Sequence, residues 1–129
     1  MLCVETELKI SPVNGIGLYA KQKIKKDDVI WKFTPNLDLI INVNEFNLLP
    51  KITQKILLHY CYKSENKYVL CFDDARFINH SDNANAKDDA KLEASTIASR
   101  DIDIGEEIFC NYSNYDDEWI RHIQSPINK

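Results

Sequence analysis

The 129-residue chain has few of the residues that interrupt regular structure, with three glycines and four prolines. Its four cysteines form no C-x-x-C pair, and no histidine stands near one at the spacing of a zinc ligand. We therefore expect reduced, mostly buried thiols, with neither a metal site nor a disulfide scaffold. No apolar run approaches the roughly 18 residues of a membrane-spanning helix, so no membrane association is expected.

The chain also lacks a large excess of charge, since its formal net charge is -4 at pH 7. A general nucleic-acid binder normally carries a basic face, so direct nucleic-acid binding is not expected. The hydrophobic fraction of 44% and the charged fraction of 28% are typical of one soluble globular domain. The N-terminus lacks the basic start and apolar core of a signal peptide, which favours an intracellular protein.

Short strands dominate the hydrophobic pattern. The first ten residues alternate between apolar and polar side chains and predict a half-buried strand. Further short strands are expected at 28–33, 37–43, 67–72, 93–99 and 106–112. The pattern therefore favours a β-rich domain.

One segment, at about 48–62, predicts an amphipathic helix. Leu48, Ile52, Ile56 and Tyr60 recur every four residues and share one face, which we expect to point inward. Pro50 suits the first turn of such a helix, because proline needs no N–H partner there.

Two distant segments resemble each other. "AKQKIKKDDVI" at 20–30 and "ASRDIDIGEEI" at 98–108 share an Ala, an Ile four residues later, an acidic pair and a closing Ile. The repeat is too short for a solenoid and predicts two similar hairpin-like units.

The polar run "RFINHSDNANA" at 76–86 follows neither a helix nor a strand period. His80, Ser81 and Asp82 do not predict a catalytic triad, because consecutive residues point in different directions and no G-x-S-x-G motif is present. A metal site is not expected either, since the three histidines are scattered without i, i+4 pairing.

Two further motifs are ambiguous when each is taken alone. The loop "NGIGLYA" leads into a strand and not into a helix, which does not fit a phosphate-binding loop. It indicates either a tight turn with positive φ or a close approach of the backbone to a ligand. The aromatic residues of "GEEIFCNYSNYDDEW" either cover the edge of the core or line a site.

Together, "NGIGLYA", "RFINHS" and "GEEIFCNY" resemble, in this order, the SET-domain family of S-adenosylmethionine-dependent protein lysine methyltransferases. The resemblance covers about residues 6–119. The short chain is also similar to the minimal viral and bacterial SET proteins. The resemblance implies a mainly β fold with a few short helices, in which small curved sheets (a β-clip) carry a C-terminal pseudo-knot. It also implies an organisation into 5–43, an inserted helical region at 44–66, 67–115, and a C-terminal segment at 116–129.

The resemblance implies a role for each matching residue. Tyr112 would be the catalytic tyrosine, beside the methyl group that is transferred, and Tyr60 would act with it from the wall of the lysine channel. Cofactor binding falls to the backbone of Gly15, Ile16, Gly17 and Leu18 and to Asn79, His80, Tyr112 and Trp119. Cys110 and Tyr115 would also line the substrate channel. Arg76 is expected to brace the site, with contact to the ligand and a surface ion pair as the alternatives.

The sequence departs from the family pattern at several positions. Asp82 and Ala84 replace the Cys and Pro of the common N-H-S-C-x-P-N motif, and no Cys follows Cys110. Both halves of the post-SET zinc site are therefore missing. Cys110 also replaces a larger aromatic residue, which favours the addition of more than one methyl group. Glu118 stands where short viral members have a Tyr.

The implied partner is a protein that presents a lysine, such as a histone or another basic protein, and the chain would act as a monomer or homodimer. Two other interpretations stay open: a SET-fold binding module without methyltransferase activity, for which Cys110 and Glu118 are the hints, and an enzyme that methylates a small amine.

Overall fold

A computed structural model describes residues 1–64, 66–89 and 95–112. Short strands make up most of its regular structure and the helices are few, so the predicted mainly β fold is confirmed. The elements in chain order are β1 (Thr6–Ile10), β2 (Ile16–Ala20), β3 (Val29–Lys32), β4 (Leu39–Asn42), α1 (Val43–Leu48), α2 (Lys51–Tyr60), β5 (Tyr62–Ser64), β6 (Lys67–Leu70), the 3-10 helix η1 (Asp74–Phe77), β7 (Asn79–His80), β8 (Ala86–Asp88), β9 (Ser95–Ala98) and β10 (Phe109–Cys110).

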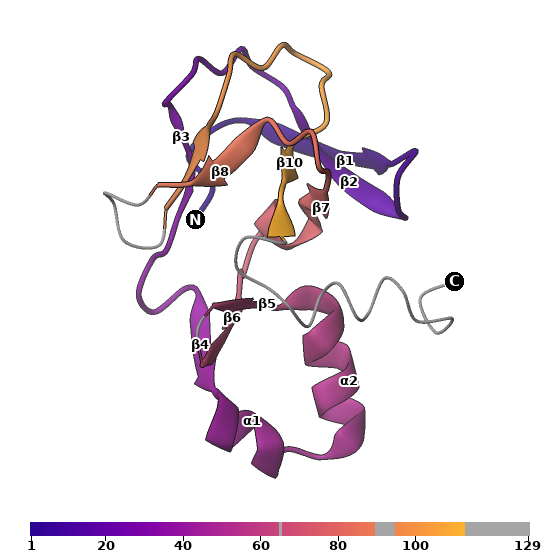
Figure 1. The fold of residues 1–129 in the computed structure, drawn as a ribbon, viewed down its shortest axis with the longest axis vertical. Coiled ribbons are helices and arrows are strands. Elements are labelled where there is room, and N and C mark those ends of the chain that lie inside the picture. Colours follow the sequence, from indigo (N-terminus) through magenta and orange to yellow (C-terminus); the bar gives the residue numbers. More distant parts are fainter. Residues whose placement is uncertain (65, 90–94, 113–129) are drawn as a thin grey trace.

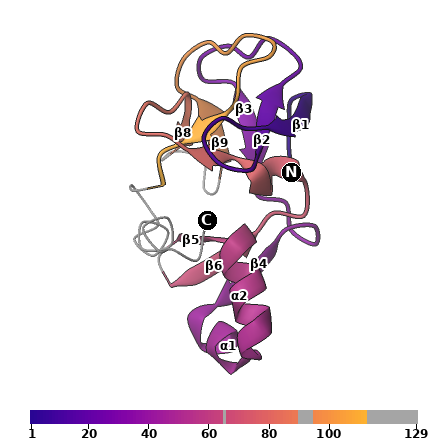
Figure 2. The same cartoon turned by 90° about the vertical axis from the view of Figure 1, so that its right-hand side faces the viewer.

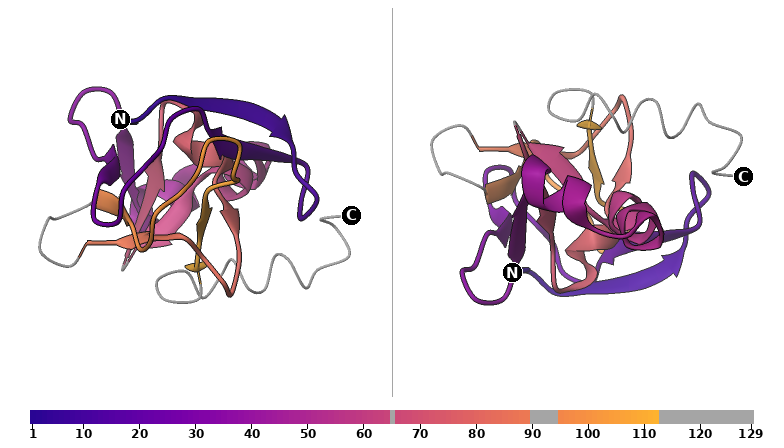
Figure 3. Two further views of the ribbon diagram at one scale, coloured as in Figure 1. Left: turned by 90° about the horizontal axis from the view of Figure 1, so that it is seen from above. Right: turned by 90° about the horizontal axis from the view of Figure 1, so that it is seen from below.

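The elements form two lobes, which lie above and below each other in Figure 1 and are turned by 90° in Figure 2. The upper one, here called the β lobe, contains β1 to β3, η1 and β7 to β10. The lower one, here called the helical lobe, contains β4 to β6 with α1 and α2. Viewed from below, the two helices stand in front of the β lobe (Figure 3).

The β lobe combines a hairpin with a five-stranded sheet. β1 and β2 pair antiparallel, and the sheet has the order β3-β9-β8-β10-β7. β10 comes last in the chain but lies between β7 and β8, and it runs parallel to both. The two predicted polar segments, one beginning at Arg76 and one ending at Tyr112, are therefore side by side. The pseudo-knot depends on the chain after Tyr112, which lies outside the described residues, so it stays a prediction.

The two similar segments, 20–30 and 98–108, pair with each other, and a pseudo-twofold axis relates one to the other. Ile24 and Ile102, which match in the repeat, form an antiparallel bridge with N–H to O=C distances of 2.9 and 2.8 Å. Ala20 bonds to Glu106 on one side of this bridge, and Asp28 bonds to Ala98 on the other. The two segments run side by side at the top of Figures 1 and 2. The two similar segments are thus equivalent halves of one paired unit, in which Ile24 and Ile102 are buried.

The predicted helix of 48–62 corresponds to α2, and a separate helix, α1, precedes it. α1 begins at Val43, where Asn42 accepts a hydrogen bond from the Glu45 N–H at 2.8 Å and closes a capping box. This cap ends the strand that was expected to reach residue 43. α2 begins after Pro50, which is its N-cap residue and not a residue of its first turn.

The orientation predicted for the helix is wrong. Ile52 and Ile56 share a face of α2 but are 67 and 53% exposed, and Leu48, which belongs to α1, is 86% exposed. The inner side of α2 instead contributes Gln54, Leu57 and Leu58. A four-residue spacing shows which side chains share a face, but it does not show which face is buried.

The first strand is also shorter and more exposed than expected. β1 begins at Thr6, while Leu2 makes an isolated bridge with Trp31. Ile10, at the far end of β1, is 87% exposed because the hairpin projects from the sheet, as Figure 1 shows.

The buried apolar residues of the described chain form two clusters of unequal size. The smaller cluster, in the helical lobe, contains Ile41, Phe46 and Tyr68. The larger, in and under the β lobe, contains Leu18, Ala20, Ile24, Ile30, Trp31, Val69, Cys71, Ala75, Ile78, Ala86, Ala98, Ile102, Ile108 and Cys110. Adjacent residues of β6, Tyr68 and Val69, point to different clusters and so tie the lobes together. Within the described residues, no helix is long and apolar enough to cross a membrane.

Candidate active site

The glycine loop between β1 and β2 contains two glycines that serve different purposes. Gly15 has φ +49, and its carbonyl accepts a hydrogen bond from the Ser11 N–H at 2.8 Å, which closes the turn. Gly17 lies within β2, and a Cβ there would stand 2.0 Å from Glu107 Oε1. The close approach considered for this loop is thus made at Gly17 to a carboxylate of the same chain. Leu18 is fully buried, and its carbonyl accepts from the Ile108 N–H at 2.8 Å.

Asn79 connects the "RFINHS" segment to the glycine loop. Its side-chain Nδ2 donates to the carbonyl oxygens of Asn14 at 3.1 Å and Ile16 at 3.2 Å, and to Glu107 Oε1 at 2.9 Å. Three acceptors around one group identify it as the amide nitrogen. None of the hydrogen bonds found within the described residues uses Asn79 Oδ1, so this oxygen is left as an acceptor.

His80 connects the same segment to the backbone of Tyr112. The Tyr112 N–H donates to His80 Nδ1 at 3.0 Å, and His80 Nε2 lies 3.1 Å from Asp82 Oδ1. Because Nδ1 accepts, the ring proton belongs on Nε2, from which it donates to Asp82. Asp82, which replaces the expected zinc-ligand Cys, therefore orients the histidine that holds the tyrosine backbone.

Tyr112 is anchored at both its backbone and its ring. Its hydroxyl donates to the Ile78 carbonyl, and its ring packs against the main core with its centroid 6.0 Å from that of His80. Sequence reasoning missed Ile78, whose contribution is a carbonyl oxygen and carries no side-chain signal. Tyr115 and Trp119 lie outside the described residues, so their predicted roles stay predictions.

A cavity of about 120 Å³ brings residues from both lobes together. Tyr60, at the end of α2, and Tyr112 and Cys110, at the end of β10, all line it. Its remaining walls include Asn14, Trp31, Leu58, His59, Cys61, Tyr62, Cys71, Ala75, Arg76, Ile78, Asn79, Asp88 and Thr96. The fold thus places the predicted channel residues Tyr60 and Cys110 in one space with Tyr112 and Asn79.

Arg76 braces this cavity through aromatic rings. Its guanidinium carbon is 5.2 Å from the ring centroid of Tyr60 and 5.2 Å from that of Phe77. The two rings meet edge to face at 6.1 Å. This arrangement holds Tyr60, on the helical lobe, against η1 of the β lobe by cation–π contact.

One wall of the cavity is poor in water. Burial raises the pKa of the Cys61 thiol to about 11 and that of the Cys71 thiol to about 12, the latter with help from the charges of Asp38 and Asp73. Burial also raises the pKa of Tyr62. The Trp31 Nε1–H is buried there without an acceptor among the described residues. Such a wall disfavours charge on any titratable group that enters.

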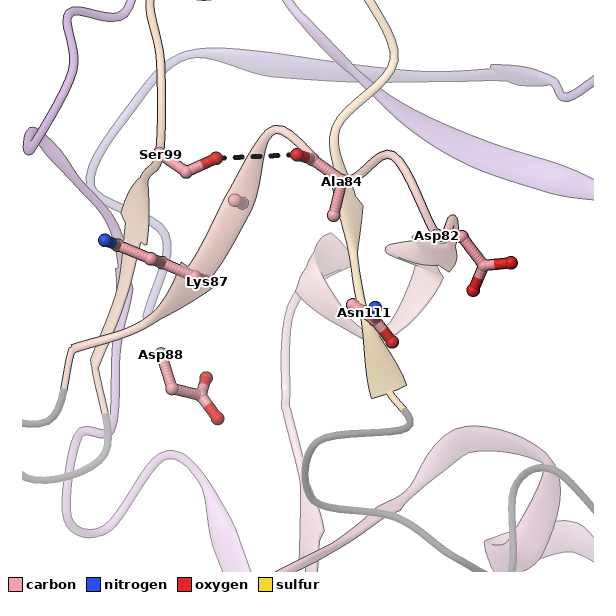
Figure 4. A pocket seen from close by; sticks show the side chains of 7 residues that line it. Asp82, Ala84, Lys87, Asp88, Ser99 and Asn111 are labelled. Carbon is pink, nitrogen blue, oxygen red and sulfur yellow. Dashed lines mark hydrogen bonds between the residues drawn. The ribbon is translucent and has the colours of Figure 1, made fainter.

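A second, more open cavity of about 470 Å³ lies along β8 and β10. Figure 4 shows Asp82 on one side of it and Lys87 and Asp88 on the other, with Asn111 between them. Ser99 Oγ lies 3.5 Å from the Ala84 carbonyl at one end. Asp88 lines both cavities. In the described part of the chain, no group of three or more His, Cys, Asp or Glu side chains is arranged to hold a metal ion.

The fold and this cavity define a class of small β proteins in which a C-terminal strand, inserted between two earlier strands, brings a tyrosine to a glycine loop and an Asn-His pair. The family model of the SET domain matches residues 15–113, and the chain belongs to the SET-domain family. No curated protein sequence matches the chain.

Solved structures share the fold at low sequence identity. A Plasmodium falciparum protein described as a histone methyltransferase has a TM-score of 0.60 and 22% identity, over 86% of this chain and 95% of that one. A subunit of Chaetomium thermophilum Polycomb Repressive Complex 2, bound to the inhibitor GSK126, has a TM-score of 0.69 and 20% identity over 95% of this chain. The match spans 18% of that subunit. The same complex bound to S-adenosylmethionine gives a TM-score of 0.67, 19% identity and coverage of 94% and 16%.

Proposed function

We propose that this protein transfers methyl groups from S-adenosylmethionine to the ε-amine of a lysine in a protein. One observation carries the proposal: Asn79, Tyr112 and Tyr60, which come from three distant segments, line one small cavity. In the family these positions belong to cofactor binding, catalysis and the lysine channel. A solved structure of similar fold is bound to S-adenosylmethionine, which supports the same cofactor here.

The residues at the glycine loop suit this cofactor. Asn79 Oδ1 remains as an acceptor, and the nearby groups are the carbonyls of Asn14 and Ile16 and the Glu107 carboxylate. Acceptors and a negative charge fit a ligand that carries an ammonium and a sulfonium. The cofactor would supply an electrophilic methyl group, while Gly15, Gly17, Asn79 and His80 would hold and orient it.

The dry wall of the cavity would prepare the lysine. A lysine has a pKa of about 10.4 in water, so it arrives as an ammonium that cannot attack. The burial that raises the thiol pKa values of Cys61 and Cys71 would lower the pKa of an amine in the same space. The lysine proton would leave to water, and the amine lone pair would face the methyl group beside the Tyr112 hydroxyl. Alignment, more than acid or base strength, then supplies the rate.

The open cavity is a suitable place for the substrate backbone. Asp82 and Asp88 border it, and Asp88 also lines the inner cavity. The two carboxylates outnumber the one ammonium of the wall, that of Lys87, and so favour a basic segment, which agrees with a histone or another basic protein as substrate.

The proposal is tested by methyl transfer from labelled S-adenosylmethionine to a mixture of histones and cell proteins. Tyr112→Phe should lose methyl transfer by a factor of about 100 or more while retaining cofactor binding within about twofold, because only the hydroxyl is removed. Undiminished transfer by this variant would contradict the assigned role. Cofactor binding without transfer by the wild-type protein would instead identify a SET-fold binding module.

A further inference from the structure

Glu107 is a buried carboxylate that the catalytic scheme above does not use. Its side chain is 7% exposed, yet it reaches three separate segments of the chain. Oε2 accepts from the Ser11 hydroxyl at 2.9 Å and from the Tyr19 hydroxyl at 3.2 Å, and Oε1 accepts from Asn79 Nδ2 at 2.9 Å. The carboxylate therefore lies directly behind the glycine loop and the cofactor-binding asparagine.

The fold holds this carboxylate rigidly. The Glu107 backbone carbonyl accepts from Asn85 Nδ2 at 2.8 Å, and the residue forms an isolated bridge with Tyr19. Gly17 has no side chain and so leaves space for the Glu107 carboxylate, because a Cβ at position 17 would stand 2.6 Å from Glu107 Cδ. A small residue in a strand interior thus marks a close approach, here to a charged group.

No cation of the described chain neutralises Glu107. None of the ion pairs found among the described residues involves Glu107, and Lys9, whose Nζ lies 5.4 Å from the centroid of the Tyr19 ring, pairs with Glu7 at 2.8 Å. All three donors to Glu107 are neutral. Removal from water, followed by the charge of Glu107, raises the pKa of the Tyr19 hydroxyl, as expected beside an uncompensated anion. A buried charge without a counter-ion is costly and gains most from a cationic ligand.

We propose that Glu107 is a positioning and specificity residue that makes the site select a positively charged cofactor, an inference that rests on the proposed function. Its carboxylate draws the Asn79 nitrogen inward, which turns Oδ1 outward to accept from the cofactor's ammonium. Its negative charge favours S-adenosylmethionine, with a net charge of about +1, over the product S-adenosylhomocysteine, with a net charge of about zero. Methyl transfer removes the sulfonium charge, so the attraction weakens when the product must leave.

Glu107→Gln isolates the charge from the packing. The Gln oxygen would still accept from Asn79, and its amide nitrogen would donate to the oxygens of Ser11 and Tyr19. The Tyr19 hydroxyl would then donate to the Ile10 carbonyl, which already lies 3.2 Å away. The contacts with Asn79, Ser11 and Tyr19 are thereby kept while the charge is lost, and the Ser11 hydroxyl proton turns away from position 107.

Glu106→Gln is the matched control. Glu106 is the preceding carboxylate, more exposed, and it pairs with Arg100 at 3.3 Å. The same substitution there removes a charge from the same turn but leaves the contacts of Asn79 unchanged.

Calorimetric titration with S-adenosylmethionine and S-adenosylhomocysteine tests the proposal. Glu107→Gln should weaken binding of S-adenosylmethionine by roughly tenfold and that of S-adenosylhomocysteine by less than about twofold. The thermal unfolding midpoint should stay near that of the wild type, and Glu106→Gln should change neither affinity. Equal loss of both affinities, or no loss, would overturn the role of Glu107 and leave the proposed function standing.

Failure of the proposed function would look different, because the wild-type protein itself would then bind neither ligand or would bind S-adenosylmethionine without transferring its methyl group. If Glu107→Gln does not fold, Glu107→Asp serves as the second variant. Aspartate keeps the charge but reaches less far, so both affinities should fall while the preference for S-adenosylmethionine stays. Loss of that preference in folded Glu107→Asp would also overturn the proposal.

Discussion

The two lobes stabilise their halves of the site in different ways. The β lobe is built on the main cluster of fourteen buried residues, to which β6 of the helical lobe adds Val69, and the polar groups around Asn79 and Glu107 are tied together by hydrogen bonds. In the helical lobe, the buried cluster among the described residues has three members, and Tyr60 is held by contact with Arg76 and Phe77. The half proposed to bind the cofactor is therefore rigid, and the half proposed to receive the lysine is held more loosely. Substitutions should separate these two properties.

The β lobe is most directly disturbed at Gly17. Gly17→Ala would place a Cβ 2.0 Å from Glu107 Oε1 and expel a carboxylate to which Asn79 is bonded. We expect a loss of about 4 kcal/mol in the free energy of unfolding, from overpacking and a broken buried hydrogen bond, measured by urea denaturation. Affinity for S-adenosylmethionine should fall by at least about tenfold.

Gly15→Ala is the matched control for this effect. The position has φ +49 but no atom near the added Cβ, so about 1 kcal/mol of backbone strain is expected. Equal losses for the two variants would show that the space at Gly17 is unimportant.

The helical lobe is most directly disturbed at Phe46, whose ring stacks on Tyr68 at 4.2 Å. Phe46→Ala should cost about 3 kcal/mol and loosen α2, since it removes one of the three buried members of the small cluster. Hydrogen exchange should rise in α1 and α2 more than in the β lobe, and KM for the protein substrate should rise more than Kd for the cofactor. Leu48→Ala, at an exposed position of the same helix, should cost less than about 0.5 kcal/mol. Uniform exchange over both lobes after Phe46→Ala would contradict the comparison.

The thiols provide a milder probe, because Cys61 packs against the small cluster and Cys71 belongs to the large one. Their folded-state pKa values are raised from 9.0 to about 11 and about 12, so the protonated forms stabilise the fold below about pH 9. This stability is lost as the pH rises toward 11 and 12, by about 1.4 kcal/mol per pH unit for Cys71 and less for the more accessible Cys61. Alkylation between pH 9 and 11, followed by mass spectrometry, should modify Cys61 before Cys71. The reverse order would contradict the difference in burial.

The sequence predicted the parts of the site that depend on residue type. "NGIGLYA", "RFINHS" and "GEEIFCNY" named Asn79, Tyr112 and the glycine loop, and the spatial proximity of the last two segments is confirmed by strand β10 lying beside β7. The pairing of the two similar segments through Ile24 and Ile102 could not be read from their likeness, because similarity does not specify register.

The sequence failed where burial depends on the rest of the fold. Ile52 and Ile56 have the spacing of a buried face, but the small cluster of the helical lobe packs against Leu57 and Leu58 of α2 instead. Glu107 lies within the "GEEI" motif, but the motif alone indicates no role for it. Its importance comes from the space at Gly17, which belongs to another segment. The role of the Ile78 carbonyl, which accepts from the Tyr112 hydroxyl, could not be predicted from residue types, because every residue has a carbonyl.

The most direct test of the account is the identity of the atom that receives the methyl group. The wild-type protein and Tyr112→Phe would be incubated with S-adenosylmethionine that carries a deuterated methyl group, together with histones and cell proteins, and the products would be mapped by tandem mass spectrometry. If the protein is a lysine methyltransferase, deuterated methyl groups should be found on lysine Nζ with the wild-type protein and almost none with Tyr112→Phe. Deuterated methyl groups on other acceptors, or none at all from a protein that binds S-adenosylmethionine, would contradict the account.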